Sequence, residues 1–181
     1  MGVKLLESYM LGDMKALYFL DDEKRLAELM LLPAEMEPLP WTEKHQEIDA
    51  LIQLKLEGDV YTGAYAGGKT MRQSGSVQKM KFERQEVTED PSHTEIITCC
   101  RDDRGYEADH HLIWKNGAET LESFVVFRNQ SASICGLELL ESFSIGGITP
   151  FAPGDAPEHL VLHRLRSDWG MEGRLESDPL E

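Results

Sequence analysis

The sequence predicts an all-β protein, an antiparallel β-sandwich, and two patterns carry that prediction. Long stretches alternate apolar and polar residues with a period of two, the spacing of a strand with one buried face. Clusters of Asp, Asn, Gly, Pro and Ser separate these stretches at short intervals, as in a meander of hairpins. The length of 181 residues allows a core of useful size. We therefore expect one domain over residues 1–181.

The first fifty residues give mixed signals. Residues 4–10 and 15–20 are expected to pair as a hairpin across Gly12. Residues 26–32 fit a helix or a strand equally well, and Pro33 ends the element in either case.

A better strand pattern follows, because Ile52, Leu54 and Leu56 alternate with polar residues. Residues 58–76 then form a long polar, glycine-rich stretch that we expect to be a loop. Loops of this length inside a compact domain are usually functional.

From about Val77 onward we expect one strand after another. The dipeptide Asn116-Gly117 is the strongest turn signal, because the two-residue hairpin that it favours needs positive φ at both positions. The strands expected here cover residues 94–101, 106–115, 121–128, 134–145 and 160–166.

Charge and cysteine usage restrict the partners and the compartment. The net charge is −15, with 33 acidic against 18 basic residues. Nucleic acid and anionic membranes would repel such a chain, so we expect neither as a partner, whereas neutral ligands such as sugars stay open. The first residues, MGVKLLESYM, hold no long apolar stretch, and the three cysteines include an adjacent pair that suits no disulfide framework. A cytoplasmic location is expected.

Few residues look suited to catalysis or metal binding. The patterns HExxH, CxxC, GxSxG and the EF-hand loop do not occur, and we expect neither a metal nor a cofactor. His110 and His111 are neighbours on a predicted strand, so their side chains point to opposite faces and cannot share one ion. His110 lies on the apolar face and is interpreted as a core histidine. Asp102 and Asp103 are interpreted as turn residues that cap their own backbone.

Three longer stretches together resemble a known family. They read GDVYTGAYAGGKTMRQSGS, ESFSIGGITPFAPGDAP and LHRLRSDWGMEGRLESDPLE, and the predicted hairpin DDRGYEADHHLIWKNG fits with them. They resemble the N-terminal region of bacterial α-galactosidases of glycoside hydrolase family 36, the melibiases. The resemblance covers residues from about Ile48 to Glu181.

This resemblance implies a layout and a role. In the family a large β-supersandwich, of the galactose-mutarotase type, precedes a (β/α)8 barrel. Two aspartates of the barrel hydrolyse α-galactosides with retention. The chain corresponds to part of the supersandwich and lacks the barrel pattern, so we expect it to be non-catalytic. The implied partners are its own catalytic barrel, α-galactoside sugars and further copies in a homo-oligomer.

Two residues are candidates for sugar contact. The resemblance matches Arg72 to an arginine that helps to hold the distal sugar in some relatives. Trp169, like Trp41, lies in irregular sequence and could stack on a sugar ring, whereas Trp114 is interpreted as a core residue.

Two other functions stay open. One is a free-standing carbohydrate-binding sandwich, with Trp41 and Trp169 as the stacking residues. The other is an aldose-epimerase-like enzyme, which would need His110 as acid together with Glu138 or Glu141 as base.

Overall fold

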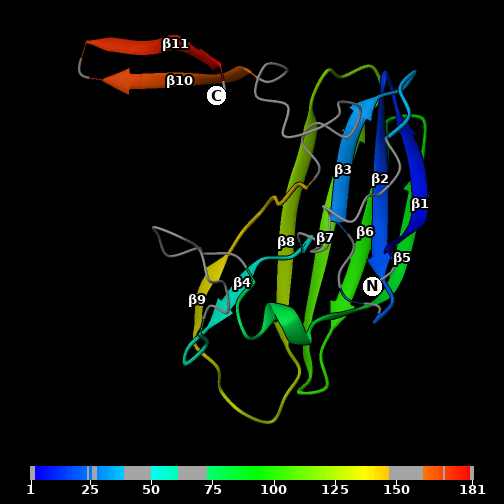
Figure 1. Cartoon of the computed structure of the whole chain (residues 1–181), viewed down its shortest axis with the longest axis vertical. Helices are drawn as coiled ribbons and strands as arrows, with labels where there is room; N and C mark the ends of the chain where they lie inside the picture. The colour runs from blue at the N-terminus through cyan, green and yellow to red at the C-terminus, as the bar shows by residue number, and fades with distance from the viewer. Residues whose placement is uncertain are drawn as a thin grey trace.

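The fold is all-β and antiparallel, as the sequence predicts. The computed structural model describes residues 3–23, 25, 28–38, 50–60, 73–146, 161–168 and 170–179. Within them, two sheets face each other in a sandwich-like arrangement (Figure 1). The strands are β1 (Val3–Leu11), β2 (Met14–Asp21), β3 (Glu28–Pro33), β4 (Leu54–Leu56), β5 (Lys81–Glu89), β6 (His93–Arg101), β7 (Tyr106–Lys115), β8 (Leu121–Asn129), β9 (Leu137–Leu140), β10 (Val161–Asp168) and β11 (Met171–Pro179).

The sheets follow the chain order closely. The larger sheet is the meander β5-β6-β7-β8, and the facing sheet is β1-β2-β3. Two small sheets, β4-β9 and β10-β11, complete the described part. The segment at the start of the expected strand region, Val77–Lys79, is a 3₁₀ turn, so the run of strands begins at Lys81 instead of Val77.

The N-terminal hairpin is confirmed. Leu11 pairs with Met14 across a two-residue turn, and Gly12 takes the positive φ of +69° that this turn requires. The ambiguous segment that follows is a strand, because β3 pairs along β2 with Tyr18 opposite Leu29. Both of these side chains are fully buried in the core.

The turn between β7 and β8 differs from the prediction. The last paired residues are Trp114 and Leu121, so residues 115–120 lie outside the ladder. The Ala118 N–H donates to the Lys115 carbonyl at 2.9 Å, and of the two central residues only Gly117 has positive φ, +80°. That is the pattern of a type II turn inside a longer connection. The predicted hairpin is confirmed, with its strands ending at Lys115 and resuming at Leu121, whereas the positive φ expected at Asn116 is not observed.

The strands around β4 and β9 are shorter than predicted. The strand expected over residues 134–145 is reduced to Leu137–Leu140, and Ile134 is fully exposed. Its partner β4 offers only three residues, so the ladder cannot extend further. Gln53, expected on a polar face, is buried because its side chain joins the Ala50 carbonyl and the Gln73 N–H.

The core lies between the two facing sheets. It consists of one face of each sheet, and the central members from the large sheet are Ile96, Cys100, Ala108 and Leu112. The Tyr9 hydroxyl donates to Gln85 Oε1 at 2.7 Å, and Gln85 Nε2 donates to Thr98 Oγ1 at 2.7 Å. This chain of hydrogen bonds ties β1 to β5 and β6 at the margin of the core, and it satisfies polar groups that packing partly removes from water.

The hairpin β10–β11 pairs only with itself among the described residues. Leu165 faces Leu175 across the ladder, and the two residues are 72% and 61% exposed. Val161, on the same face of β10, is 50% exposed. The hairpin therefore presents an uncovered apolar face.

Candidate functional site

A pocket is lined by residues of the β1–β2 turn and the β7–β8 turn. Both turns lie at the same end of the sandwich, at the top of Figure 1. The volume of the pocket is about 380 Å³, towards the small end of the range of about 300–1,000 Å³ that is usual for small-molecule sites. The apolar lining residues are Leu11, Met14, Leu31, Trp114, Ala118, Leu121 and Phe143. The polar ones are Asp13, Glu119, Thr120 and Ser123.

Trp114 is held firmly in the wall of this pocket. Its indole Nε1–H donates to the Ala118 carbonyl at 2.9 Å, a contact made possible by the longer turn. On the other side the indole lies against Gly12, where an added Cβ would sit 3.0 Å from the Trp114 Cζ2 atom. Trp114 packs against the core, as predicted, and it also presents part of its ring to the pocket.

Ser123 connects the pocket lining to the core histidine. Its hydroxyl donates to the Ser142 carbonyl at 2.6 Å, which uses its only proton. His110 Nε2, at 3.0 Å from Ser123 Oγ, must therefore be the donor. The imidazole is the neutral Nε2–H tautomer, and its Nδ1 atom has no hydrogen-bond partner among the described residues.

Burial keeps His110 neutral. The residue is fully buried, and this desolvation, followed by the effect of His111, lowers its pKa to about 4. A neutral imidazole without contact to solvent is a poor general acid. The interpretation of His110 as a core residue is confirmed. Its burial leaves the Nδ1 atom without a hydrogen bond among the described residues, which is unfavourable.

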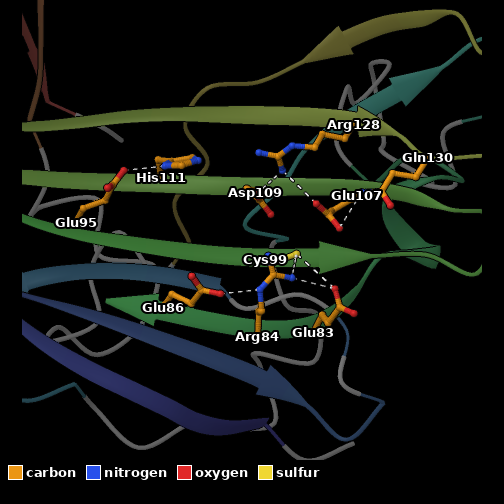
Figure 2. Close-up of polar contacts among 10 residues, drawn as sticks. All are labelled: Glu83, Arg84, Glu86, Glu95, Cys99, Glu107, Asp109, His111, Arg128 and Gln130. Atoms are coloured by element: carbon orange, nitrogen blue, oxygen red, sulfur yellow. Dashed lines mark hydrogen bonds and ion pairs between the residues drawn. The ribbon is translucent and has the colours of Figure 1, made fainter. Parts of the chain in front are cut away.

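The outer face of the β5–β8 sheet, which points away from the core, carries an ion-pair network around Asp109 (Figure 2). Arg128 reaches across from β8 and contacts both Glu107 Oε1, at 3.1 Å, and Asp109 Oδ2. Both acidic residues are less than a tenth exposed. Their burial on the predicted polar face follows from the register, because Arg128 lies opposite Glu107 and covers the carboxylates.

The charges in this network fix its protonation states. Burial alone would raise the pKa of Asp109, but the hydrogen bonds from Arg128 and Cys99 and the charges of Arg128 and Arg84 outweigh it, and the pKa is lowered. Burial and the neighbouring Asp109 raise the pKa of the Cys99 thiol. Cys99 thus stays protonated, which makes it an inert thiol instead of a nucleophile.

A metal does not fit this network. The ligand atoms of Glu83, Cys99 and Glu107 lie within 4.8 Å of one another. Arginine already occupies them, since Arg84 Nη1 lies 3.3 Å from Glu83 Oε2 and 3.2 Å from Cys99 Sγ, and Arg128 contacts Glu107. Guanidinium groups supply the positive charge that a metal ion would bring, so we assign no metal here.

The other histidine of the predicted pair belongs to this outer face. His111 Nδ1 lies 2.8 Å from Glu95 Oε1, and its ring stacks on Phe124 with the centroids 4.4 Å apart. His110 and His111 thus face opposite sides of the sheet, as predicted. Asp102 is confirmed as a turn residue, because its Oδ1 accepts hydrogen bonds from the N–H groups of Arg104 and Tyr106.

The residues predicted to contact sugar are not placed. Arg72, Trp169 and Trp41 lie outside the described residues. Of the set considered for an epimerase, Glu138 is paired with Lys55 on the β4–β9 sheet, whereas His110 is buried between the two facing sheets.

The stretch that contains Arg72, residues 61–72, also contains a phosphate-loop pattern. Residues 63–70, GAYAGGKT, match GxxxxGK[ST], which binds phosphates only when a helix follows directly. The next described residues lead into the 3₁₀ turn Val77–Lys79, which is too short to supply such a helix. We therefore assign no phosphate-binding site to this pattern.

The pocket was not foreseen, because its walls come from four separate parts of the sequence. No protein-family model, no curated protein and no solved structure matches the chain. The described residues contain no helix of the length and apolarity that a membrane span requires.

Proposed function

We propose that the chain is the N-terminal, non-catalytic β-sandwich domain of an α-galactosidase of glycoside hydrolase family 36. The resemblance of the three quoted stretches is the basis of the proposal. The observation that supports it is the antiparallel meander β5-β6-β7-β8, because the DDRGYEADHHLIWKNG segment forms the β6–β7 turn and strand β7 of a sandwich. A supersandwich domain requires this kind of sheet.

The outer face of the β5–β8 sheet is suited to contact with a catalytic barrel. Phe124, on the edge strand β8, is 41% exposed, and Arg128 on the same strand and Arg84 on the other edge strand, β5, have side chains 42% and 46% exposed. Arg128 is already held by the buried carboxylates of Glu107 and Asp109, and Arg84 by ion pairs with Glu83 and Glu86, so both lose little further conformational freedom when a partner covers them. The aromatic and arginine content is typical of the centre of a protein interface.

The hairpin β10–β11 is the surface we propose for oligomer contacts. Its apolar face, with Leu165 and Leu175, is exposed in the single chain. A two-stranded hairpin is marginally stable alone, so covering this face by a second copy would stabilise it. Size-exclusion chromatography with light scattering should show a species larger than a monomer, and Leu165→Arg should shift it towards the monomer.

The activity assay compares two polypeptides. The chain alone should leave p-nitrophenyl-α-galactoside at the background rate, because the two carboxylates that a retaining glycosidase needs, held about 5 Å apart, are expected in the barrel. The longer polypeptide of the same reading frame should hydrolyse it. Turnover by the chain alone, abolished by replacing one of its own acidic residues, would overturn the proposal, as would a longer polypeptide with no such activity.

The structure bears differently on the two alternative functions, the carbohydrate-binding sandwich and the epimerase-like enzyme. The free-standing carbohydrate-binding sandwich depends on Trp41 and Trp169, and it stays a prediction. The epimerase-like reading loses its support, since His110 is buried and held in the neutral tautomer by Ser123.

A further inference from the structure

The pocket between the β1–β2 and β7–β8 turns has a fixed shape. Trp114 is tied to the Ala118 carbonyl on one turn and packed against Gly12 on the other. Ser123 is tied to Ser142 and His110. A pocket whose walls are held by hydrogen bonds before the ligand arrives loses little conformational entropy on binding.

Among the polar side chains that line this pocket, most can only accept a hydrogen bond from a ligand, and Thr120 is the one whose hydroxyl can also donate. The carboxylates of Asp13 and Glu119 stand exposed at its edge, and neither has a side-chain partner among the described residues. The protons of Ser123 and of the Trp114 indole are already donated within the chain. A ligand with hydrogen-bond donors of its own suits the two carboxylates, and anions are repelled by them and by the net charge of −15.

The remaining wall is apolar and offers a ring surface. Trp114 and Phe143 are the aromatic lining residues, and Leu31 and Leu121 are aliphatic. Ammonium ligands are bound in cages of several aromatic rings, whereas here aliphatic groups form much of the wall. An apolar wall with acceptors at one edge suits a ring that is apolar on its face and carries hydroxyl groups at its edge.

We propose that this pocket binds a neutral pyranose sugar, with its ring against Trp114 and its hydroxyls donating to Asp13 and Glu119. The volume of about 380 Å³ suits one sugar unit. Only the choice of a galactoside as the first probe rests on the proposed function, because the argument for a sugar uses the pocket alone.

The test follows the three tryptophan indole N–H signals of the 181-residue chain by nuclear magnetic resonance. Trp114→Phe assigns the Trp114 signal by its disappearance. Methyl α-D-galactopyranoside and methyl α-D-glucopyranoside are titrated to about 50 mM, because single sugar units with few contacts bind in the millimolar range. The Trp114 signal should move in a saturable way with at least one of them.

A charge-removing variant makes the test specific. Asp13→Asn with Glu119→Gln keeps the shapes but weakens the acceptors, and it should weaken binding about fivefold or more, as hydrogen bonds to charged groups are the stronger ones. Glu122→Gln is the matched control, because Glu122 lies on the same hairpin and pairs with Lys115 on the other face. It should bind like the unaltered chain.

Three outcomes would overturn the inference: no saturable shift with either sugar, equal weakening by both variants, or saturation by tetramethylammonium alone. The activity assay of the longer polypeptide is independent of these measurements. A chain that binds no sugar can belong to an active α-galactosidase, so the two proposals fail separately.

Discussion

Acidification from pH 7 to pH 5 should destabilise the fold through His110. In the native chain this imidazole is neutral, fully buried and bonded to Ser123 through Nε2. Its pKa is lowered to about 4, first by burial and then by His111. An unfolded histidine titrates near pH 6.5, so between these two values the unfolded chain binds more protons than the folded one. The free energy of unfolding therefore falls as the pH is lowered through this window.

The magnitude follows from the two pKa values. The full difference, between about 6.5 and about 4, corresponds to roughly 3 kcal/mol, which is lost completely only below about pH 4. At pH 5 the loss should already be about 2 kcal/mol. Asp90 interferes little in this window, because hydrogen bonds from Ser92 lower its pKa to about 2 and its contribution is lost only in stronger acid.

Urea unfolding at pH 7, 6 and 5, followed by circular dichroism, measures the effect. His110→Gln keeps a donor for Ser123 but cannot titrate, so its stability should change by about 2 kcal/mol less than that of the unaltered chain. His163→Gln is the control, because it removes a histidine from the exposed surface of β10 and leaves the buried His110 in place. The same pH dependence in the unaltered chain and in His110→Gln would refute the reasoning.

Two further predictions concern single contacts. Gly12→Ala and Gly117→Ala each place a side chain at positive φ, +69° and +80°, at a cost of roughly 1–2 kcal/mol. Only Gly12 meets a neighbour, the Trp114 ring, so its variant should be less stable by about a further 1 kcal/mol, and equal thermal unfolding of the two would contradict the close packing. Arg128→Ala leaves Glu107 and Asp109 buried without their cation and should lower stability by about 2 kcal/mol, less than for a fully buried pair because Arg128 is partly exposed. Lys115→Ala, which removes an exposed pair with Glu122, should cost no more than about 0.5 kcal/mol in the same urea titration, and a similar loss in both variants would argue against the network.

The sequence was informative where alternation and turn chemistry agreed. Strand β7 is predicted from Tyr106 to Lys115 and observed with the same bounds, because one face of it is continuously buried. The hairpin at Gly12 follows from the same agreement. By contrast, the strand predicted over residues 134–145 forms only over Leu137–Leu140, since its alternation has no long partner to pair with.

The errors have a common cause in contacts between distant residues. The dipeptide Asn116-Gly117 favours a two-residue turn locally, but Trp114 binds the Ala118 carbonyl and packs on Gly12, which fixes a longer connection. Alternation also predicts that Glu107 is exposed, whereas Arg128 covers it from the next strand. The candidate residues Arg72 and Trp169 lie outside the described residues, so their roles stay predictions.

Two of the surfaces proposed to bind partners, the pocket and the outer face of the β5–β8 sheet, share one strand and face opposite ways. Trp114 of β7 lines the pocket on the core side of the sheet, whereas Asp109 and His111 of the same strand belong to the outer face. A barrel packed on the outer face would therefore leave the pocket open, because the pocket is lined from the core side of the sheet and from the two turns at its end. Strand β7 has well-paired neighbours on both sides, so each surface is supported by the same rigid ladder. Sugar binding in the pocket and docking on the outer face are thus compatible in one molecule, and neither requires the other.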